Sequence, residues 1–86
     1  MTGTTTERQD VARYNDAVRA GMTAAAGLKE ALARVGVVIP SLRASEPVNG
    51  NGFIELGGVN AGTATKLAEV INAAADAVPE LRAPAQ

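Results

Sequence analysis

The acidic side chains are the first candidates for chemistry, because the 86 residues include no histidine and no cysteine. Without histidine, the usual proton shuttle near neutral pH is missing. Without cysteine, thiol nucleophiles and disulfides are excluded, and nearly all zinc sites need one of these two residue types. Most of the nine carboxylates fall on the polar faces of the expected helices. We therefore predict no metal site and no acid–base catalyst.

Hydroxyl nucleophiles give no better candidate. The two serines, Ser41 and Ser45, lie in the segment between the expected helices, and no base is available to activate either. Turn and cap hydrogen bonds explain both. The prediction is a non-enzymatic protein with no catalytic residue and no cofactor.

A glycine-rich segment, Gly57–Thr63, has the place and spacing of a phosphate-binding loop, because it follows an expected strand and opens a helix. However, Thr63 and Ala64 occupy the positions where such a loop needs lysine and a magnesium-binding hydroxyl. We therefore predict a sharp strand-to-helix turn. A weak anion site at this helix end remains an alternative, formed by Gly58, Asn60, Gly62 and Thr63.

Charge and hydropathy narrow the classes of partner. The net charge is −1 with the signs interspersed, so the basic stripe of nucleic-acid-binding proteins is missing. The two aromatic residues, Tyr14 and Phe53, make no stacking platform. No apolar run reaches the roughly 20 residues that span a bilayer, and the polar first residues are not a signal peptide. We expect a cytoplasmic protein, and six arginines against two lysines suggest a GC-rich bacterial genome.

A regular apolar seam predicts one long helix over residues 7–35. Thr6 with Gln9 forms a capping box at its start, with Thr4 and Glu7 as a competing frame, and residues 1–6 are expected to be flexible. Gly36 and Pro40 end the helix. The seam alternates spacings of three and four residues and consists of Val11, Tyr14, Val18, Gly21, Ala25, Leu28, Leu32 and Val35. We expect the Tyr14 hydroxyl to reach water.

The middle of this seam has almost no side-chain bulk. Gly21 and Ala25 favour a close crossing with another backbone, because glycine within a helix costs about 1 kcal/mol relative to alanine and something must offset that loss. The alternative is a general bias toward small residues with a local bend.

A second seam predicts a helix over residues 61–78, with Asn60 as its N-cap and Pro79 at its end. This seam again alternates three and four, through Ala64, Leu67, Ile71, Ala74 and Val78. Residues 80–86 form an expected flexible tail.

Residues 37–58 are expected to contain a short β-hairpin. Asn49-Gly50-Asn51-Gly52 is a strong turn signal between the expected strands 42–48 and 53–56. An isolated hairpin is barely stable, so it must pack on the helices or pair with another chain. Pro47 confines its strand to an edge. Phe53 either pins the hairpin to the helices or is an exposed anchor for a partner.

These elements predict a single, mostly helical α+β domain over residues 7–79. Its order is helix, hairpin, helix, and we expect the two long helices to be antiparallel. A chain this short is only marginally stable as a monomer. We therefore predict a homodimer that forms a four-helix bundle. Alternatively, the hairpins of two chains could join into a four-stranded sheet. The candidate interface consists of Val18, Gly21, Ala25, Leu28, Leu32, Phe53, Leu67 and Ile71.

The function that this sequence favours is a small protein-interaction module, either a homo-oligomeric adaptor or a regulatory accessory protein. Its partners would be itself and an unidentified protein. A ligand- or anion-binding regulator that uses the entry to the second helix is one alternative. A nucleic-acid-associated factor is another, which the charge balance disfavours.

Overall fold

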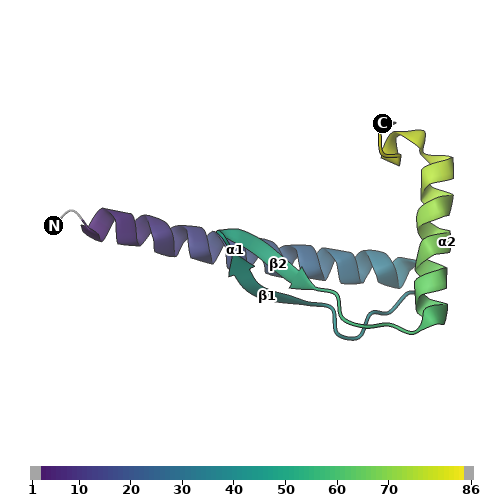
Figure 1. Ribbon diagram of the computed structural model, residues 1–86, viewed down its shortest axis with the longest axis horizontal. Helices are drawn as coiled ribbons and strands as arrows, with labels where there is room; N and C mark the ends of the chain where they lie inside the picture. Colours follow the sequence, from purple (N-terminus) through teal and green to yellow (C-terminus); the bar gives the residue numbers. More distant parts are fainter. Residues whose placement is uncertain (1–2, 85–86) are drawn as a thin grey trace.

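The computed structural model describes the backbone of residues 3–84 and the side chains of residues 8–84. It contains two helices with a two-stranded antiparallel hairpin between them, so the predicted order is confirmed (Figure 1). The elements are α1 (Gly3–Arg34), β1 (Arg43–Val48), β2 (Asn51–Glu55), α2 (Ala61–Ala77) and a short 3-10 helix, η1 (Pro79–Leu81).

Helix α1 begins four residues before the predicted start. Both predicted capping frames therefore lie within the helix, and Thr4, Thr6 and Glu7 are among the residues whose side chains the structure does not describe. Threonine is a weak helix former but does not break a helix, so the threonine-rich start can extend it.

The end of α1 is a Schellman motif. The Gly36 N–H donates to the Ala33 carbonyl over 3.1 Å, and the Val37 N–H donates to the Leu32 carbonyl over 2.9 Å. This motif needs a left-handed residue, and Gly36 supplies it with φ 73°. The motif also brings Val37 against Leu32, and both are buried. The helix terminus thus turns the chain directly into the core.

The hairpin turn has the predicted chemistry. Asn49 and Gly50 both have positive φ, 53° and 77°, as a type I′ turn requires. The strands lie at 43–48 and 51–55, so the second begins two residues earlier than predicted. Between the pairs Ser45–Phe53 and Val48–Asn51 the register shifts, because two residues of β1 oppose Gly52 alone. Pro47 lies in this bulge, where a missing N–H is tolerated.

The hairpin packs on the middle of α1 through two glycines. A Cβ placed on Gly52 would lie 2.7 Å from the Ala17 carbonyl oxygen and 2.9 Å from the Gly21 nitrogen. A Cβ on Gly21 would lie 3.3 Å from the Phe53 carbonyl oxygen. The predicted close crossing at Gly21 is therefore confirmed. Its occupant is the chain's own β2.

The core lies under the C-terminal end of α1, in the segment that follows it. Its buried residues are Leu32, Val37, Ile39 and Leu42, and Ile54 and Leu67 pack against them from β2 and α2. Three of the four buried residues thus come from the connection between α1 and β1. The sequence had given this connection no structural role.

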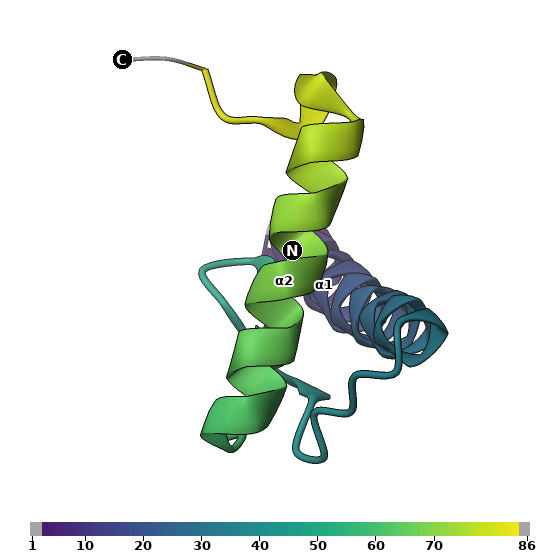
Figure 2. The same ribbon diagram turned by 90° about the vertical axis from the view of Figure 1, so that its right-hand side faces the viewer.

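Helix α2 lies crosswise at the end of α1, as Figures 1 and 2 show. Within the described residues, no Cα atom of α1 lies within 8 Å of a Cα atom of α2, so the two helices do not run side by side. The predicted antiparallel pairing of the helices within the chain is therefore wrong, and a four-helix bundle loses its expected building unit. The reason lies in the connection, where Gly57 has φ 79° and lies directly against Ser41. That contact fixes the start of α2 beside the core and directs the rest of the helix away.

Candidate interaction surface

The predicted interface residues of α1 divide into covered and partly covered positions. Gly21, Ala25 and Leu32 are buried, and Gly21 lies against the backbone of β2. Val18 is half-buried, and Leu28 is just over one-third exposed. The hairpin thus occupies the small-residue centre of α1, so the prediction that Gly21 and Ala25 face a second subunit is wrong.

Phe53 lies on the face of the hairpin that points away from α1. Its neighbours Gly52 and Ile54 face α1 and the core, and side chains alternate along a strand. Consistent with this, Phe53 is 46% exposed. The interpretation of Phe53 as a pin between hairpin and helices is therefore wrong, and the exposed position fits the alternative.

An ion pair borders Phe53 on this outer face. Arg43 and Glu55 oppose each other across the strands, and the Arg43 Nη2 lies 2.7 Å from the Glu55 Oε2. The Arg43 Nε donates to the same oxygen over 3.1 Å. Since both side chains are more than half exposed, their pairing contributes at most about 1 kcal/mol.

Tyr14 links the N-terminal half of α1 to β1. Its hydroxyl donates to the Glu46 Oε2 over 2.9 Å, and the side chain is exposed, so this hydrogen bond adds to the expected contact with water. This hydrogen bond, together with the negative charge of Glu46, raises the pKa of Tyr14 above its usual 10.0. The two residues are 32 positions apart, and no local pattern in the sequence signals their contact.

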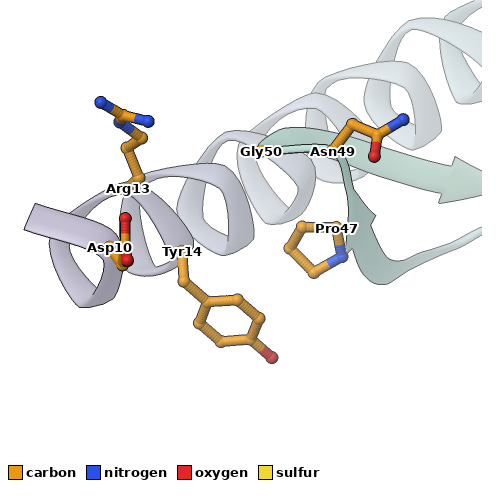
Figure 3. Close-up of a pocket in the computed structure, with 6 residues that line it drawn as sticks. All are labelled: Asp10, Arg13, Tyr14, Pro47, Asn49 and Gly50. Carbon is orange, nitrogen blue, oxygen red and sulfur yellow. The ribbon is translucent and has the colours of Figure 1, made fainter. Parts of the chain in front are cut away.

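Open hollows flank this Tyr14–Glu46 contact. One, of about 390 Å³, is lined by Asp10, Arg13, Tyr14, Pro47, Asn49 and Gly50. Figure 3 shows the Tyr14 ring and Arg13 projecting from α1 in different directions, so the polar groups do not converge on one point. A binding site for a small molecule needs converging polar groups in a concave apolar pocket. This hollow therefore offers no specific ligand chemistry.

Helix α2 is largely uncovered within the chain. None of its residues is buried; Leu67 is half-buried, whereas Ile71 is 58% exposed. The predicted seam is therefore only partly right: Leu67 packs on the core, but the remaining positions face outward. We call these exposed positions the α2 stripe: Ala64, Ile71, Ala74 and Val78.

The entry to α2 is an ordinary helix cap. The Asn60 side chain accepts a 2.8 Å hydrogen bond from the Thr63 N–H, which confirms Asn60 as the N-cap. This bond uses a donor that an anion at Gly58, Asn60, Gly62 and Thr63 would need. The weak anion site given as an alternative there stays untested, with that donor already satisfied.

Among residues 8–84, no group of three or more acidic side chains gathers where it would hold a metal ion. No helix in the described part of the chain is both long enough and apolar enough to cross a bilayer. Comparison of the chain with protein-family models, curated proteins and solved structures finds no match.

Proposed function

We propose that this protein is a non-enzymatic interaction module that acts as a homo-oligomer, with a dimer as its basic unit. The observation that carries the proposal is the amount of surface that one chain leaves uncovered. A compact chain of 8.7 kDa has an accessible surface of about 4,700 Å². This chain exposes 6743 Å², an excess of roughly 2,000 Å² by the same relation.

The shape of the chain supports the same proposal. Its extents are 56 × 33 × 21 Å and its radius of gyration is 17.5 Å. A compact chain of this length has a radius of about 12 Å. A chain with so extended a shape buries little apolar surface. Because it has neither cysteine nor histidine, it also lacks disulfides and the common zinc sites. Association is the remaining route to stability.

The charge of the chain is compatible with self-association. A net charge of −1 gives two copies little electrostatic repulsion. Of the two modes of dimerisation expected from the sequence, the four-helix bundle lacks its antiparallel pair of helices within one chain, and edge pairing of hairpins meets a different obstacle. Pro47 and the bulge beside it interrupt one edge, and such features discourage strand addition.

The outer hairpin face supports an adaptor role for the oligomer. Phe53 is the chain's one phenylalanine, and it lies exposed beside the Arg43–Glu55 ion pair. Exposed aromatic residues bordered by polar groups often anchor protein partners. An anion-binding or nucleic-acid-binding role has less support, because Asn60 satisfies the Thr63 N–H and the charge is slightly negative.

Sedimentation equilibrium of the full chain at micromolar concentration tests the proposal. We expect a mass of twice 8.7 kDa, falling toward 8.7 kDa on dilution. A mass of 8.7 kDa at every concentration up to the millimolar range would contradict it. A larger, defined oligomer would keep the proposal but change its unit.

A further inference from the structure

We infer that Asn49 is a site of covalent modification, at which the side chain converts spontaneously to aspartate and isoaspartate after attack by the Gly50 backbone nitrogen. The chain contains two Asn-Gly pairs, Asn49-Gly50 and Asn51-Gly52, which follow each other directly. The same dipeptide chemistry is thus present twice. The structure favours the reaction at the first pair and opposes it at the second. This inference does not depend on the proposed homo-oligomer.

The reaction needs only the chain and water. The Gly50 nitrogen bonds to the side-chain carbonyl carbon of Asn49, and its proton passes to the solvent. The bond from that carbon to the side-chain nitrogen breaks, ammonia leaves, and a five-membered cyclic imide remains. One water molecule then opens the ring at either carbonyl, which gives aspartate or isoaspartate. Asparagine is thermolabile, and a following glycine favours this reaction because no Cβ obstructs the attacking nitrogen.

Ring closure sets a condition on the backbone of the asparagine. The new ring is nearly flat, so the nitrogen of the next residue must eclipse the asparagine Cβ about the Cα–C bond. Because Cβ and the residue's own nitrogen are about 120° apart around a tetrahedral Cα, this condition corresponds to a ψ of about −120° in an L residue. The first central residue of a type II′ turn has this ψ together with a positive φ.

Asn49 is one peptide rotation away from this geometry. Its φ is 53°, which already has the sign that a type II′ turn requires at this position, and Gly50 follows with φ 77°. Turning the peptide plane between them converts the type I′ turn into a type II′ turn and changes mainly ψ of Asn49 and φ of Gly50. Gly50 accepts the negative φ that results because it has no Cβ. Both turn types close two-residue hairpins, so the strands stay paired.

The surroundings of the turn leave room for this rotation. Asn49 and Gly50 are exposed, and a Cβ placed on Gly50 would meet no atom within 4 Å. Figure 3 shows the Asn49 side chain projecting from the turn with no other labelled side chain beside it. Solvent can therefore accept the proton and reach the imide.

Asn51 has the same following residue but opposite surroundings. It is the first residue of β2, it pairs with Val48, and its φ is not positive. From the ψ of about 135° that is typical of an antiparallel strand, the reactive value is roughly 105° away. Gly52 would have to move with this rotation, yet a Cβ placed on it would lie 2.7 Å from the Ala17 carbonyl oxygen. Reaction at Asn51 therefore requires that β2 first separate from α1.

The modification changes the hollow beside the turn. Asn49 lines this hollow together with Asp10 and Arg13, one charge of each sign, so the product adds a second carboxylate to its lining. The chain thereby gains one negative charge beyond its net −1. Isoaspartate also inserts one carbon into the main chain of the two-residue turn, where the register of the hairpin is set. The contact of β2 with α1 is not part of the reaction.

Peptide mapping after incubation in mildly alkaline buffer tests the inference. Cleavage after Arg43 and Lys66 gives one peptide, residues 44–66, that contains both pairs, and fragment masses between them assign each new carboxyl group. In the folded chain, we expect the product at Asn49 to form at least about tenfold faster than at Asn51, because Asn51 reacts only from a locally opened state. In concentrated urea, the two positions should react at similar rates, because the dipeptide is the same.

Asn49→Gln and Asn51→Gln are the matched variants. Glutamine keeps the amide but needs a larger, six-membered ring, so each variant removes the rapid reaction at one position. Ion-exchange chromatography of the folded protein follows the more acidic product. Asn49→Gln should abolish its early formation, whereas Asn51→Gln should leave its rate within about threefold of the wild type. Far-UV circular dichroism checks that both variants are folded.

The outcomes decide the inference in either direction. A rate ratio of at least about tenfold in the folded chain that disappears in urea, with the early acidic product lost only in Asn49→Gln, supports it. A smaller ratio in the folded chain, or a faster reaction at Asn51, overturns it. An Asn49 that reacts in urea but not in the folded chain also overturns it, because the turn would then hold Asn49 away from ring closure.

Discussion

Adding one methyl group at Gly52 tests how closely β2 lies against α1. The Cβ of alanine at this position would lie 2.7 Å from the Ala17 carbonyl oxygen and 2.9 Å from the Gly21 nitrogen. Non-bonded carbon contacts are normally about 3.5–4.0 Å. Both obstructing atoms belong to the helix backbone and cannot rotate away, so β2 must retreat by roughly 1 Å. The backbone contact of Phe53 with Gly21 would then be lost.

The size of the effect follows from this geometry. Overpacking typically costs about 1–3 kcal/mol, and we expect Gly52→Ala near the upper end because only backbone atoms are in the way. The whole chain should be stable by about 4–13 kcal/mol. A loss of about 3 kcal/mol would lower the Tm by more than about 10 °C. Urea unfolding followed by circular dichroism measures the loss, at one fixed protein concentration because association adds to stability.

Gly27→Ala is the matched control. A Cβ there meets nothing within 4 Å, and alanine is the better helix former, so we expect a gain of about 1 kcal/mol. Gly21→Ala should fall between the two, because its Cβ would meet the Phe53 carbonyl oxygen at 3.3 Å. If Gly52→Ala unfolds at the same urea concentration as the wild type, the close crossing of β2 and α1 does not exist in solution.

Three further predictions follow from other contacts. Leu42→Ala should lower the free energy of unfolding by about 2–5 kcal/mol, measured by chemical unfolding, because Leu42 is only 2% exposed. Its control is Val38→Ala, at a 71% exposed position, which should stay within about 0.5 kcal/mol of the wild type. Asn60→Ala should lower the free energy of unfolding by about 1 kcal/mol, because the hydrogen bond that caps α2 is lost. Asn60→Gly should lower it by only a few tenths of a kcal/mol, because glycine is itself a good N-cap residue. Equal losses would argue against the cap. Tyr14 is the chain's one tyrosine, so ultraviolet absorbance should follow its titration, with a pKa above 10.0. Glu46→Gln should lower that pKa. The hydrogen bond stabilises the fold below pH 10, and this stabilisation is lost as the pH rises through the pKa of Tyr14 in the folded state.

The parts of the fold that depend on local chemistry were predictable. Asn49 and Gly50 specify their turn because both tolerate positive φ. Asn60 specifies the start of α2 through a bond three residues away. Gly21 signalled a close contact because a helix rarely places glycine at its centre without a packing reason. In each case the residue type limits the backbone or its nearest neighbours.

The arrangement of these elements in space was not predictable from periodicity. The direction of α2 depends on one positive φ at Gly57 and on its contact with Ser41, 16 residues earlier. Helical periodicity predicts which face of a helix is apolar. It does not predict whether the same chain or another molecule covers that face. The α2 seam correctly marked an apolar face, of which the chain covers Leu67 and leaves Ile71 exposed.

The core residues Val37, Ile39 and Leu42 were missed although a signal existed. Gly36 was recognised as the end of α1, and a Schellman end usually brings the second residue after it against the last turn. That rule places Val37 on Leu32, as the structure has it. The alternation of Val37 and Ile39 then puts both on one side of the chain. Read together, these two signals mark the connection as core.

Because the connection over residues 36–42 supplies most of the core, it cannot vary in length as ordinary loops do. One inserted residue would break the step from Gly36 through Val37 and Ile39 to Leu42 and displace at least one of them into solvent. Asn49 and Gly50 are both exposed and lie outside the core cluster, so residues added at this turn would displace no core side chain. Grafted peptides and fluorescent tags therefore belong at that turn, and the stretch that looks like a spacer is the one to leave untouched.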